Sequence, residues 1–292
     1  MKIALYGKEF SEDFKEKITG MFRQFKDFQA DIYIHDRFKQ ILERSGLTDY
    51  TFTSVYTDQE GLPGDTEVLL SLGGDGTFLE TLRFVIKRKV PVLGINTGRL
   101  GFLANISRDE LKDSIQCLLK NEYTTETRSL INLTTSEGPL DEFDTALNEI
   151  TIHKKGLAMI SIYTSLNGEY LNSYWADGLI ISTPTGSTAY SMAVGGPIML
   201  PQSRNYIISP VSPHNLTVRP IVVPDDMEIR LKVKSRSDQF MVALDSRSYI
   251  VDTSRELIIS KAGKEIKMVK FHGTNFYNTL RNKLMWGVDR RN

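Results

Sequence analysis

The sequence predicts an α/β N-terminal domain with a Rossmann-like parallel sheet, followed by a β-rich C-terminal domain. In the first 125 residues, short apolar runs typical of buried strands alternate with amphipathic helical segments, which is the pattern of a parallel α/β layer. Beyond about Thr124 strand-like runs dominate, and Asn167-Gly168 between two of them indicates a hairpin. A chain of 292 residues is long enough for two such domains.

The expected elements of the first half follow the hydrophobic periodicity. Strands are expected at Ile3–Tyr6, near Ile32, at Thr51–Val55, at Val68–Leu72 and at Val90–Ile95. Ser11 can cap a helix whose apolar stripe contains Phe14, Ile18, Met21, Phe22, Phe25 and Phe28. Further helices are expected around Phe38–Arg44, over Thr77–Lys87, and after Ser107, which forms a capping box with Glu110.

In the second half, further strands are expected at Glu256–Ser260 and Glu265–Val269. Asn275–Trp286 is expected to form a short final helix.

The bulk composition excludes several classes of protein. Lys plus Arg equals Asp plus Glu at 36 each, so no net charge favours nucleic acid or an acidic membrane. The start MKIALYGKEF has no apolar core of signal-peptide length, and no segment is apolar enough to span a bilayer. The single cysteine, Cys117, excludes an internal disulfide and favours a cytoplasmic protein. The four histidines show no metal-ligand spacing, so we expect no zinc site.

The most informative stretch is EVLLSLGGDGTFLE, from Glu67 to Glu80. It predicts a buried strand, a tight turn containing Gly73, Gly74 and Gly76, and a helix. Glycines let a ligand approach the backbone, and the free N–H groups at a helix start suit phosphate. Asp75 among these glycines would repel a bare phosphate, so its charge must be offset by a metal, a cation or a proton that it removes. The alternative is that Asp75 only caps the helix beginning near Thr77.

Further polar residues interrupt apolar strands at several points. Gly94, Asn96, Gly98 and Gly101 mark a second close-approach loop after a predicted parallel strand, on the sheet edge where ligands bind in α/β folds. In the β-rich half the interruptions are Asn148-Glu149, Asp177-Gly178 and the loop STPTGSTAYSMAVGGPI from Ser182 to Ile198. Small hydroxyl and glycine residues there suit a sugar or a planar base. Each feature alone could also be an ordinary turn or a solvated loop.

Taken together, these motifs resemble the NAD kinase family of bacterial type from about Leu69 to the C-terminus. The family's Gly-Gly-Asp-Gly-Thr loop corresponds to Gly73–Thr77, and its Gly-Ile-Asn loop to residues beginning at Gly94. The Asn-Glu pair is Asn148-Glu149, and the long block Asp-Gly-Leu-Ile-Ile-Ser-Thr-Pro-Thr-Gly-Ser-Thr-Ala-Tyr-Ser begins at Asp177. A closing Leu-Arg-x-Lys-Leu-x-Trp motif spans Leu280–Trp286. The long block is the specific part, because lipid kinases and phosphofructokinases share the short glycine loop.

The resemblance implies phosphorylation of the 2′-hydroxyl of the adenosine ribose of NAD by ATP or another phosphate donor, with a divalent cation such as Mg²⁺. It implies an α/β domain over residues 1–125, a β-rich NAD-binding domain over 126–273, an active site between them, and a helix at about 274–292 that packs back on the first domain. It also implies a homodimer or homotetramer.

The same resemblance assigns roles to residues. Asp75 is expected to accept or orient the 2′-hydroxyl proton as general base. Gly74 and Gly76 are expected to admit the donor phosphates, and Asn148 and Glu149 to hold the ribose hydroxyls. The remaining NAD- or ATP-binding residues expected from the motifs are Thr77, Asn96, Asp177, Thr188, Ala189, Tyr190, Ser191, Met192 and Ala193.

Two departures and two rival functions remain open from the sequence. Family members often have Arg where this chain has Trp175, and Asp-Gly-Gln or Asp-Ser-Gln where it reads Asp245-Ser246-Arg247. Arg247 is either a surface residue or a ligand contact, and the choice between NAD and NADH is in doubt. The rivals are a lipid kinase of the diacylglycerol type, for which no basic amphipathic helix is evident, and a non-catalytic NADP-binding sensor. A dehydrogenase is disfavoured because the first strand lacks a Gly-x-Gly-x-x-Gly turn.

Overall fold

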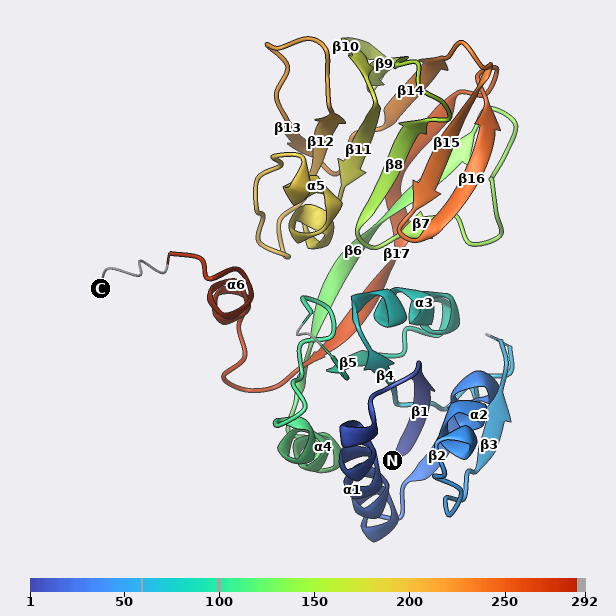
Figure 1. Cartoon of the computed structure of the whole chain (residues 1–292), viewed down its shortest axis with the longest axis vertical. Coiled ribbons are helices and arrows are strands. Elements are labelled where there is room, and N and C mark those ends of the chain that lie inside the picture. The colour runs from blue at the N-terminus through green and yellow to red at the C-terminus, as the bar shows by residue number, and fades with distance from the viewer. Residues whose placement is uncertain (59, 99–100, 288–292) are drawn as a thin grey trace. The chain divides into compact units, whose positions relative to one another are not determined.

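The computed structural model describes residues 1–58, 60–98 and 101–287. The chain divides into two compact units, which are described separately (Figure 1). Unit 1 comprises Met1–Thr127 and Ile266–Asn292, and unit 2 comprises Arg128–Glu265. No helix among the described residues has the length and apolar character needed to cross a membrane.

Unit 1 is built on a parallel sheet with the strand order β5-β4-β1-β2-β3. Its strands are β1 (Lys2–Gly7), β2 (Asp31–His35), β3 (Ser54–Tyr56), β4 (Val68–Gly73) and β5 (Val92–Asn96). Its helices are η1 (Glu12–Phe14), α1 (Lys15–Asp27), α2 (Asp36–Arg44), α3 (Asp75–Val85), η2 (Ile86–Arg88), α4 (Leu111–Leu119) and α6 (Phe276–Leu284). The prediction of a parallel α/β layer is confirmed.

The apolar faces of α1, α2 and α4 pack on this sheet in one buried cluster. The cluster contains Ile18 and Phe22 of α1, Phe38 of α2 and Ile115 of α4, together with strand residues such as Leu70. Burial of such side chains contributes on the order of 1.5–3 kcal/mol each, so these contacts are a main source of the unit's stability.

Two details of the first predicted helix need correction. Ser11 is the N-cap residue of η1, which leads into α1, but its side chain makes no cap hydrogen bond; instead its oxygen accepts a hydrogen bond from the guanidinium of Arg108 at 3.0 Å. Phe28 was expected on the buried stripe but is 46% exposed, because α1 ends at Asp27 and the chain leaves the helical path there.

Unit 2 consists mainly of antiparallel strands in two sets, whose apolar faces form one cluster. One set has the order β13-β12-β11-β8-β15-β16, and the other contains β10-β9-β14-β17. The strands are β7 (Thr145–Ala146), β8 (Glu149–Lys154), β9 (Ile160–Leu166), β10 (Glu169–Ala176), β11 (Gly178–Ser182), β12 (Asn205–Val211), β13 (Ile221–Pro224), β14 (Ile229–Lys234), β15 (Gln239–Leu244) and β16 (Arg247–Asp252). Short helices η3 (Thr185–Thr188) and α5 (Tyr190–Ala193) follow β11. The β-rich prediction is confirmed.

The Asn167-Gly168 hairpin forms as expected. Leu166 of β9 pairs with Glu169 of β10, and both turn residues have positive φ, 48° at Asn167 and 87° at Gly168. This is the geometry of a type I′ turn, which matches the natural twist of a hairpin.

Two strands run from one unit into the other, β6 (Thr124–Thr135) and β17 (Leu257–Lys270). The separate runs expected at Glu256–Ser260 and Glu265–Val269 are therefore one strand. Leu257–Ile259 pair with β14 in unit 2, whereas Met268 pairs with Val92 of β5 in unit 1. The polar residues between the two apolar runs made them look like separate strands in the sequence.

Candidate active site

The first glycine turn connects β4 to α3. The helix begins at Asp75, with Gly74 as its N-cap residue, and not near Thr77. Asp75 therefore lies in the first helical turn, and the alternative that it merely caps the helix is wrong. A Cβ on Gly73 would lie 2.2 Å from the Oγ1 of Thr77, so the turn requires glycine at this position.

The Asp75 carboxylate is held by the backbone of the second glycine loop. Its Oδ1 accepts hydrogen bonds from the N–H groups of Leu103 at 3.0 Å and Ala104 at 2.9 Å, and its Oδ2 accepts one from Phe102 at 2.9 Å. A carboxylate offers about four lone-pair sites. The described residues use three of these sites, which leaves one acceptor position on Oδ2 within the part of the chain that the structure describes.

Gly101 makes this approach possible. A Cβ at position 101 would lie 1.9 Å from the Oδ1 of Asp75. At Gly94, a Cβ would lie 2.4 Å from the carbonyl oxygen of Leu103. Of the three predicted close-approach glycines, Gly101 serves the contact between the two loops, Gly94 serves a contact within the second loop, and Gly98 has no close contact with described atoms beyond its chain neighbours.

Gly101→Ala is expected to displace the Asp75 carboxylate and to lower kcat, with a stability cost of ~1–3 kcal/mol from overpacking. Gly98→Ala is the matched control, because a Cβ at Gly98 has none of the described atoms beyond its chain neighbours within 4 Å. Steady-state kinetics and urea unfolding of the two variants measure the difference. Equal kcat values for both variants would show that the clamp on Asp75 is irrelevant to turnover.

Asn96 lies at the end of β5 and is 2% exposed. Its Oδ1 accepts a hydrogen bond from the N–H of Gly98 at 2.7 Å, and its own N–H donates to the carbonyl of Ile106 at 2.8 Å. These contacts give Asn96 a role in shaping the second loop. Its predicted contact with a ligand stays a prediction.

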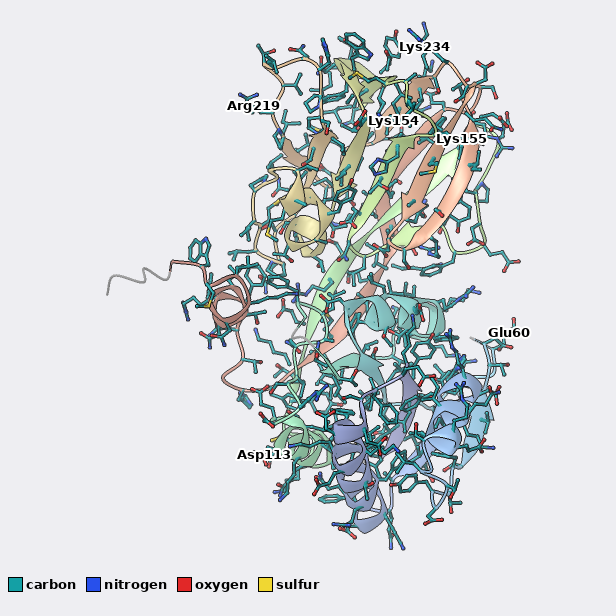
Figure 2. The ribbon with its side chains drawn as sticks, viewed as in Figure 1. Glu60, Asp113, Lys154, Lys155, Arg219 and Lys234 are labelled. Atoms are coloured by element: carbon teal, nitrogen blue, oxygen red, sulfur yellow. The ribbon has the colours of Figure 1, made fainter. Side chains whose placement is uncertain are left out.

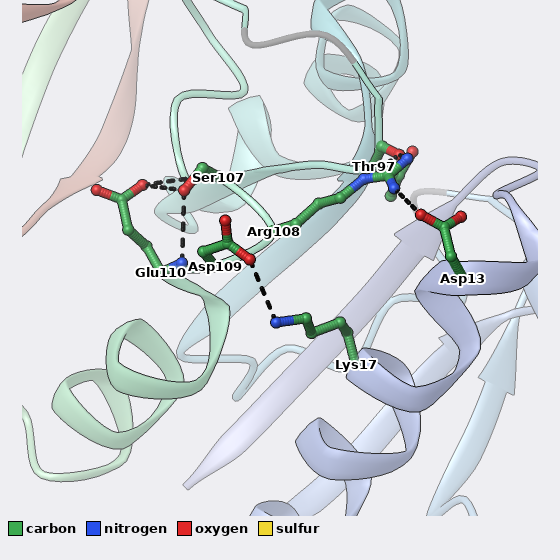
Figure 3. A network of polar contacts seen from close by, with 7 residues as sticks. All are labelled: Asp13, Lys17, Thr97, Ser107, Arg108, Asp109 and Glu110. Atoms are coloured by element: carbon green, nitrogen blue, oxygen red, sulfur yellow. Dashed lines mark hydrogen bonds and ion pairs between the residues drawn. The ribbon is translucent and has the colours of Figure 1, made fainter.

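A polar network connects the segment after the same loop to η1 and α1 (Figure 3). The Nε of Arg108 donates to the carbonyl of Thr97 at 2.9 Å, and its guanidinium forms an ion pair with Asp13. Ser107 and Glu110 form the predicted capping box, with the Ser107 N–H donating to Glu110 at 2.9 Å. The backbone that holds Asp75 is thus anchored on both sides.

A lysine from the last helix reaches the same carboxylate. The Nζ of Lys283 lies 3.7 Å from the Oδ2 of Asp75 and 4.2 Å from the ring centroid of Phe102. The Phe102 ring in turn lies 6.3 Å from that of Phe276, at the start of α6. Sequence reasoning assigned no role to Lys283, although the charge on Asp75 called for a cation.

In unit 2 a second carboxylate holds the Asn148-Glu149 turn in the same way. Asp245 accepts hydrogen bonds from the N–H groups of Leu147 at 2.9 Å, Asn148 at 2.8 Å and Glu149 at 3.3 Å. Burial raises the pKa of Asp245, and these three N–H groups act in the opposite direction. Sequence reasoning missed this role, since Asp245 is 97 residues from Asn148.

Glu149 carries a strongly perturbed carboxyl group. It is 7% exposed, and burial together with the nearby Asp245 raises its pKa to about 8, against a smaller lowering by the N–H of Tyr190. Its Oε2 has no hydrogen-bond partner among the described residues. An unpartnered buried carboxyl oxygen is costly, and a ligand hydroxyl at this position would remove the cost.

The loop after β11 packs on the same turn. A Cβ at Gly186 would lie 2.1 Å from the carbonyl oxygen of Asn148, and the Thr183 hydroxyl donates to the carbonyl of Leu147 at 2.5 Å. The structure therefore brings Asn148 and Glu149 together with the start of the predicted Thr188–Ala193 segment, whose Tyr190 N–H acts on Glu149.

Asp177 lies at the opposite end of β11 from this turn, because Ser182 pairs with Glu149 whereas Gly178 pairs with His153. Its carboxylate forms an ion pair with Lys154 at 2.5 Å (Lys154 is labelled in Figure 2). The ring of Tyr190 stacks on His153 with centroids 5.7 Å apart. Tyr190 thus spans the distance between the Glu149 and Asp177 ends of the strand.

The two residues that depart from the family pattern have different surroundings. The guanidinium of Arg247 donates to the carbonyls of Phe143 and Thr145 and lies 4.5 Å from the Phe143 ring centroid. Arg247 therefore holds the chain leading to the Asn148 turn, and a contact of Arg247 with a ligand stays a prediction. Trp175 is 50% exposed, with its ring 4.4 Å from that of His214.

No set of three His, Cys, Asp or Glu side chains within residues 1–58, 60–98 and 101–287 is arranged to hold a metal ion. Mg²⁺ is usually bound by one or two carboxylates together with substrate phosphates. Asp75, with one acceptor position left on Oδ2, fits that donor set but not an all-protein cage.

Comparison with known families and proteins gives a consistent result. The family described as ATP-NAD kinase N-terminal domain matches residues 11–123, and the ATP-NAD kinase C-terminal domain matches residues 147–271. The NAD kinase of Flavobacterium johnsoniae is 44% identical over 295 residues, and that of Bacteroides fragilis strain ATCC 25285 is 42% identical over 292, each covering 100% of both chains.

Solved structures show the same fold. The yeast NADH kinase complexed with NADH aligns with a TM-score of 0.83 at 21% identity, covering 99% of this chain and 89% of that one. An NAD kinase from Archaeoglobus fulgidus in complex with ATP aligns with a TM-score of 0.72 at 22% identity, covering 96% of this chain and 99% of that one.

Proposed function

Because this chain belongs to the NAD kinase family, we propose that it transfers the γ-phosphoryl group of ATP to the 2′-hydroxyl of the adenosine ribose of NAD, giving NADP and ADP. The observation that carries the proposal is how the Asp75 carboxylate is bound. Its carboxylate is held rigidly by three backbone N–H groups and keeps one acceptor position at the first turn of α3.

The chemistry needs a base in that position. A ribose hydroxyl is a weak nucleophile, and phosphoryl transfer depends mainly on positioning and on neutralising charge. Oδ2 of Asp75 accepts the hydroxyl proton while the ribose oxygen bonds to the γ-phosphorus and the bond to ADP breaks. The glycines at positions 74 and 76 leave open backbone, since a Cβ at either would meet nothing within 4 Å, and donor phosphates can approach there.

Unit 2 supplies the recognition of the dinucleotide in this proposal. The unpartnered Oε2 of Glu149 accepts a ribose hydroxyl, and Asn148 contributes its side-chain amide. The segment Thr188–Ala193 carries the remaining contacts, with Tyr190 presenting an aromatic face that is 38% exposed. The role of Asp177 is the least supported, because its carboxylate already pairs with Lys154.

A divalent cation is part of the proposal. The triphosphate, together with the carboxylate of Asp75, would hold such an ion, and the ion would neutralise phosphate charge.

A homodimer or homotetramer and a cytoplasmic location stay predictions from the resemblance and the composition. Light scattering on the purified chain measures the subunit number.

The proposed activity is tested by incubating the purified protein with NAD, ATP and Mg²⁺ and measuring NADP with an NADP-specific dehydrogenase. We expect NADP to accumulate with time and with enzyme concentration. NAD binding without NADP formation would instead support the sensor. A parallel assay with diacylglycerol tests the lipid kinase, for which the family match leaves no support.

A further inference from the structure

We propose that Lys283 is a further catalytic residue, a mobile cation that neutralises Asp75 before the substrates bind and moves to the transferred phosphoryl group when a substrate hydroxyl occupies the Oδ2 of Asp75. The inference deepens the proposed function and rests on it. The carrying observation is that the Lys283 ammonium lies 3.7 Å from Oδ2, the oxygen of that carboxylate that accepts only one backbone hydrogen bond among the described residues.

The ammonium group is close enough to compensate Asp75 but is not locked to it. The Nζ–Oδ2 distance of 3.7 Å is within the range of an ion pair but longer than a hydrogen bond. The three backbone N–H groups hold the carboxylate without help from Lys283. Lys283 can therefore leave Asp75 without loss of the carboxylate's position.

The aromatic ring of Phe102 contacts the ammonium group and can stay in contact with it during this movement. The Lys283 Nζ lies over the ring, 4.2 Å from its centroid, and a cation–π contact of this kind is worth ~0.5–2 kcal/mol. The same residue donates its N–H to the Oδ2 of Asp75. The ring thus keeps the ammonium beside the acceptor position whether or not the ion pair is made.

The helix that carries Lys283 is lightly attached. Leu280 is the residue that α6 buries, and the helix is capped at its start by Asn275, whose side chain accepts from the N–H of Asn278 at 2.9 Å. Lys283 is in the last turn of α6, and its side chain is 28% exposed. A small shift of this helix would move the ammonium without unfolding the sheet below it.

The charge on Asp75 changes during the reaction, so a cation beside it can act at two stages. Before substrates bind, Lys283 offsets the charge of Asp75. During transfer, Asp75 takes up a proton and becomes neutral, so the ammonium is free to offset the charge on the phosphoryl oxygens. Two other basic side chains of this unit, Arg88 and Lys8, have different surroundings, since Arg88 donates to the carbonyl of Glu60 and Lys8 pairs with Glu80.

The test compares Lys283→Met, Lys283→Arg and Lys283→Ala with the matched control Arg281→Met. Arg281 is a cation on the same helix, and its guanidinium donates to Asn278. Removing an electrostatic stabiliser of a transition state lowers kcat by roughly 10²–10³. We expect that loss in Lys283→Met, partial recovery in Lys283→Arg, near-normal turnover in Arg281→Met, and an increase in the rate of Lys283→Ala when ethylammonium is added.

A second readout separates contact with the phosphoryl group from a structural role. Lys283→Met should weaken binding of the transition-state analogue ADP–aluminium fluoride in the presence of NAD by about the same factor as kcat, with little change in the affinity for NAD alone. Normal kcat in Lys283→Met, equal losses in Arg281→Met, or analogue binding that stays unchanged while kcat falls would each overturn the proposal. If the wild-type protein makes no NADP, the proposed function fails instead.

Discussion

Replacing Asp75 by Asn is expected to lower kcat by about 10²–10⁴, the usual contribution of a general base. The amide cannot accept the 2′-hydroxyl proton, whereas the glycine turn and the start of α3 remain. The measurement is the rate of NADP formation at saturating NAD and ATP. A kcat near the wild-type value would remove the general-base role.

Asp75→Asn also changes a hydrogen bond to the second glycine loop, so the stability of the variant has to be measured as a control. An Asn side chain that keeps its carbonyl at the Oδ1 position still accepts from Leu103 and Ala104, but it places an amide NH₂ against the N–H of Phe102. The lost bond is expected to cost ~1–3 kcal/mol of unfolding free energy. Urea unfolding and NAD titration of the variant show whether the loss of turnover exceeds what a disturbed loop explains.

Replacing Glu149 by Gln is expected to abolish a large pH dependence of the free energy of unfolding. In the folded protein without ligand the pKa of this carboxyl is about 8, raised by burial and by Asp245 from an ordinary value of 4.5. The folded state therefore holds a proton that the unfolded chain releases. Its contribution to stability is fully present below pH 4.5 and is lost as the pH rises to about 8, by up to ~5 kcal/mol.

Urea unfolding of the wild-type chain and of Glu149→Gln at pH 5 and pH 9 measures this effect. The wild-type free energy of unfolding should fall relative to that of the variant between the two pH values, because the amide mimics the protonated acid and cannot ionise. Parallel profiles for the two proteins would mean that Glu149 ionises normally in the folded state.

Asp75 and Asp245 perform the same local task in different units. Each carboxylate accepts hydrogen bonds from three consecutive backbone N–H groups, at residues 102–104 and at residues 147–149. The two sites differ in which carboxyl oxygen is left to accept a hydrogen bond from a ligand. Asp75 keeps an acceptor position beside Lys283, whereas Asp245 is buried behind a turn whose Glu149 presents the free oxygen.

The local parts of the fold were predictable from the sequence. A buried strand, a glycine turn and an amphipathic helix around Asp75 depend on neighbouring residues, as does the hairpin at Asn167-Gly168, and both are present. The Ser107–Glu110 capping box likewise involves residues three positions apart.

The parts that the sequence did not reveal depend on contacts between distant segments. Ser11 occupies the predicted N-cap position, but its hydroxyl oxygen accepts from Arg108, 97 residues along the chain, and makes no cap hydrogen bond. Asp245 clamps a turn from a strand end far along the chain. Lys283 was part of a recognised motif, but only the position of α6 shows that its ammonium faces Asp75.

A crystal structure with NAD and a non-hydrolysable ATP analogue would give the most direct test, through the distance between the Asp75 carboxylate and the 2′-oxygen of the adenosine ribose. A separation of about 2.6–3.2 Å at Oδ2 is the expected result, since proton transfer requires hydrogen-bond contact. A 2′-oxygen far from Oδ2, with the carboxylate bound only to the N–H groups of residues 102–104, would contradict it.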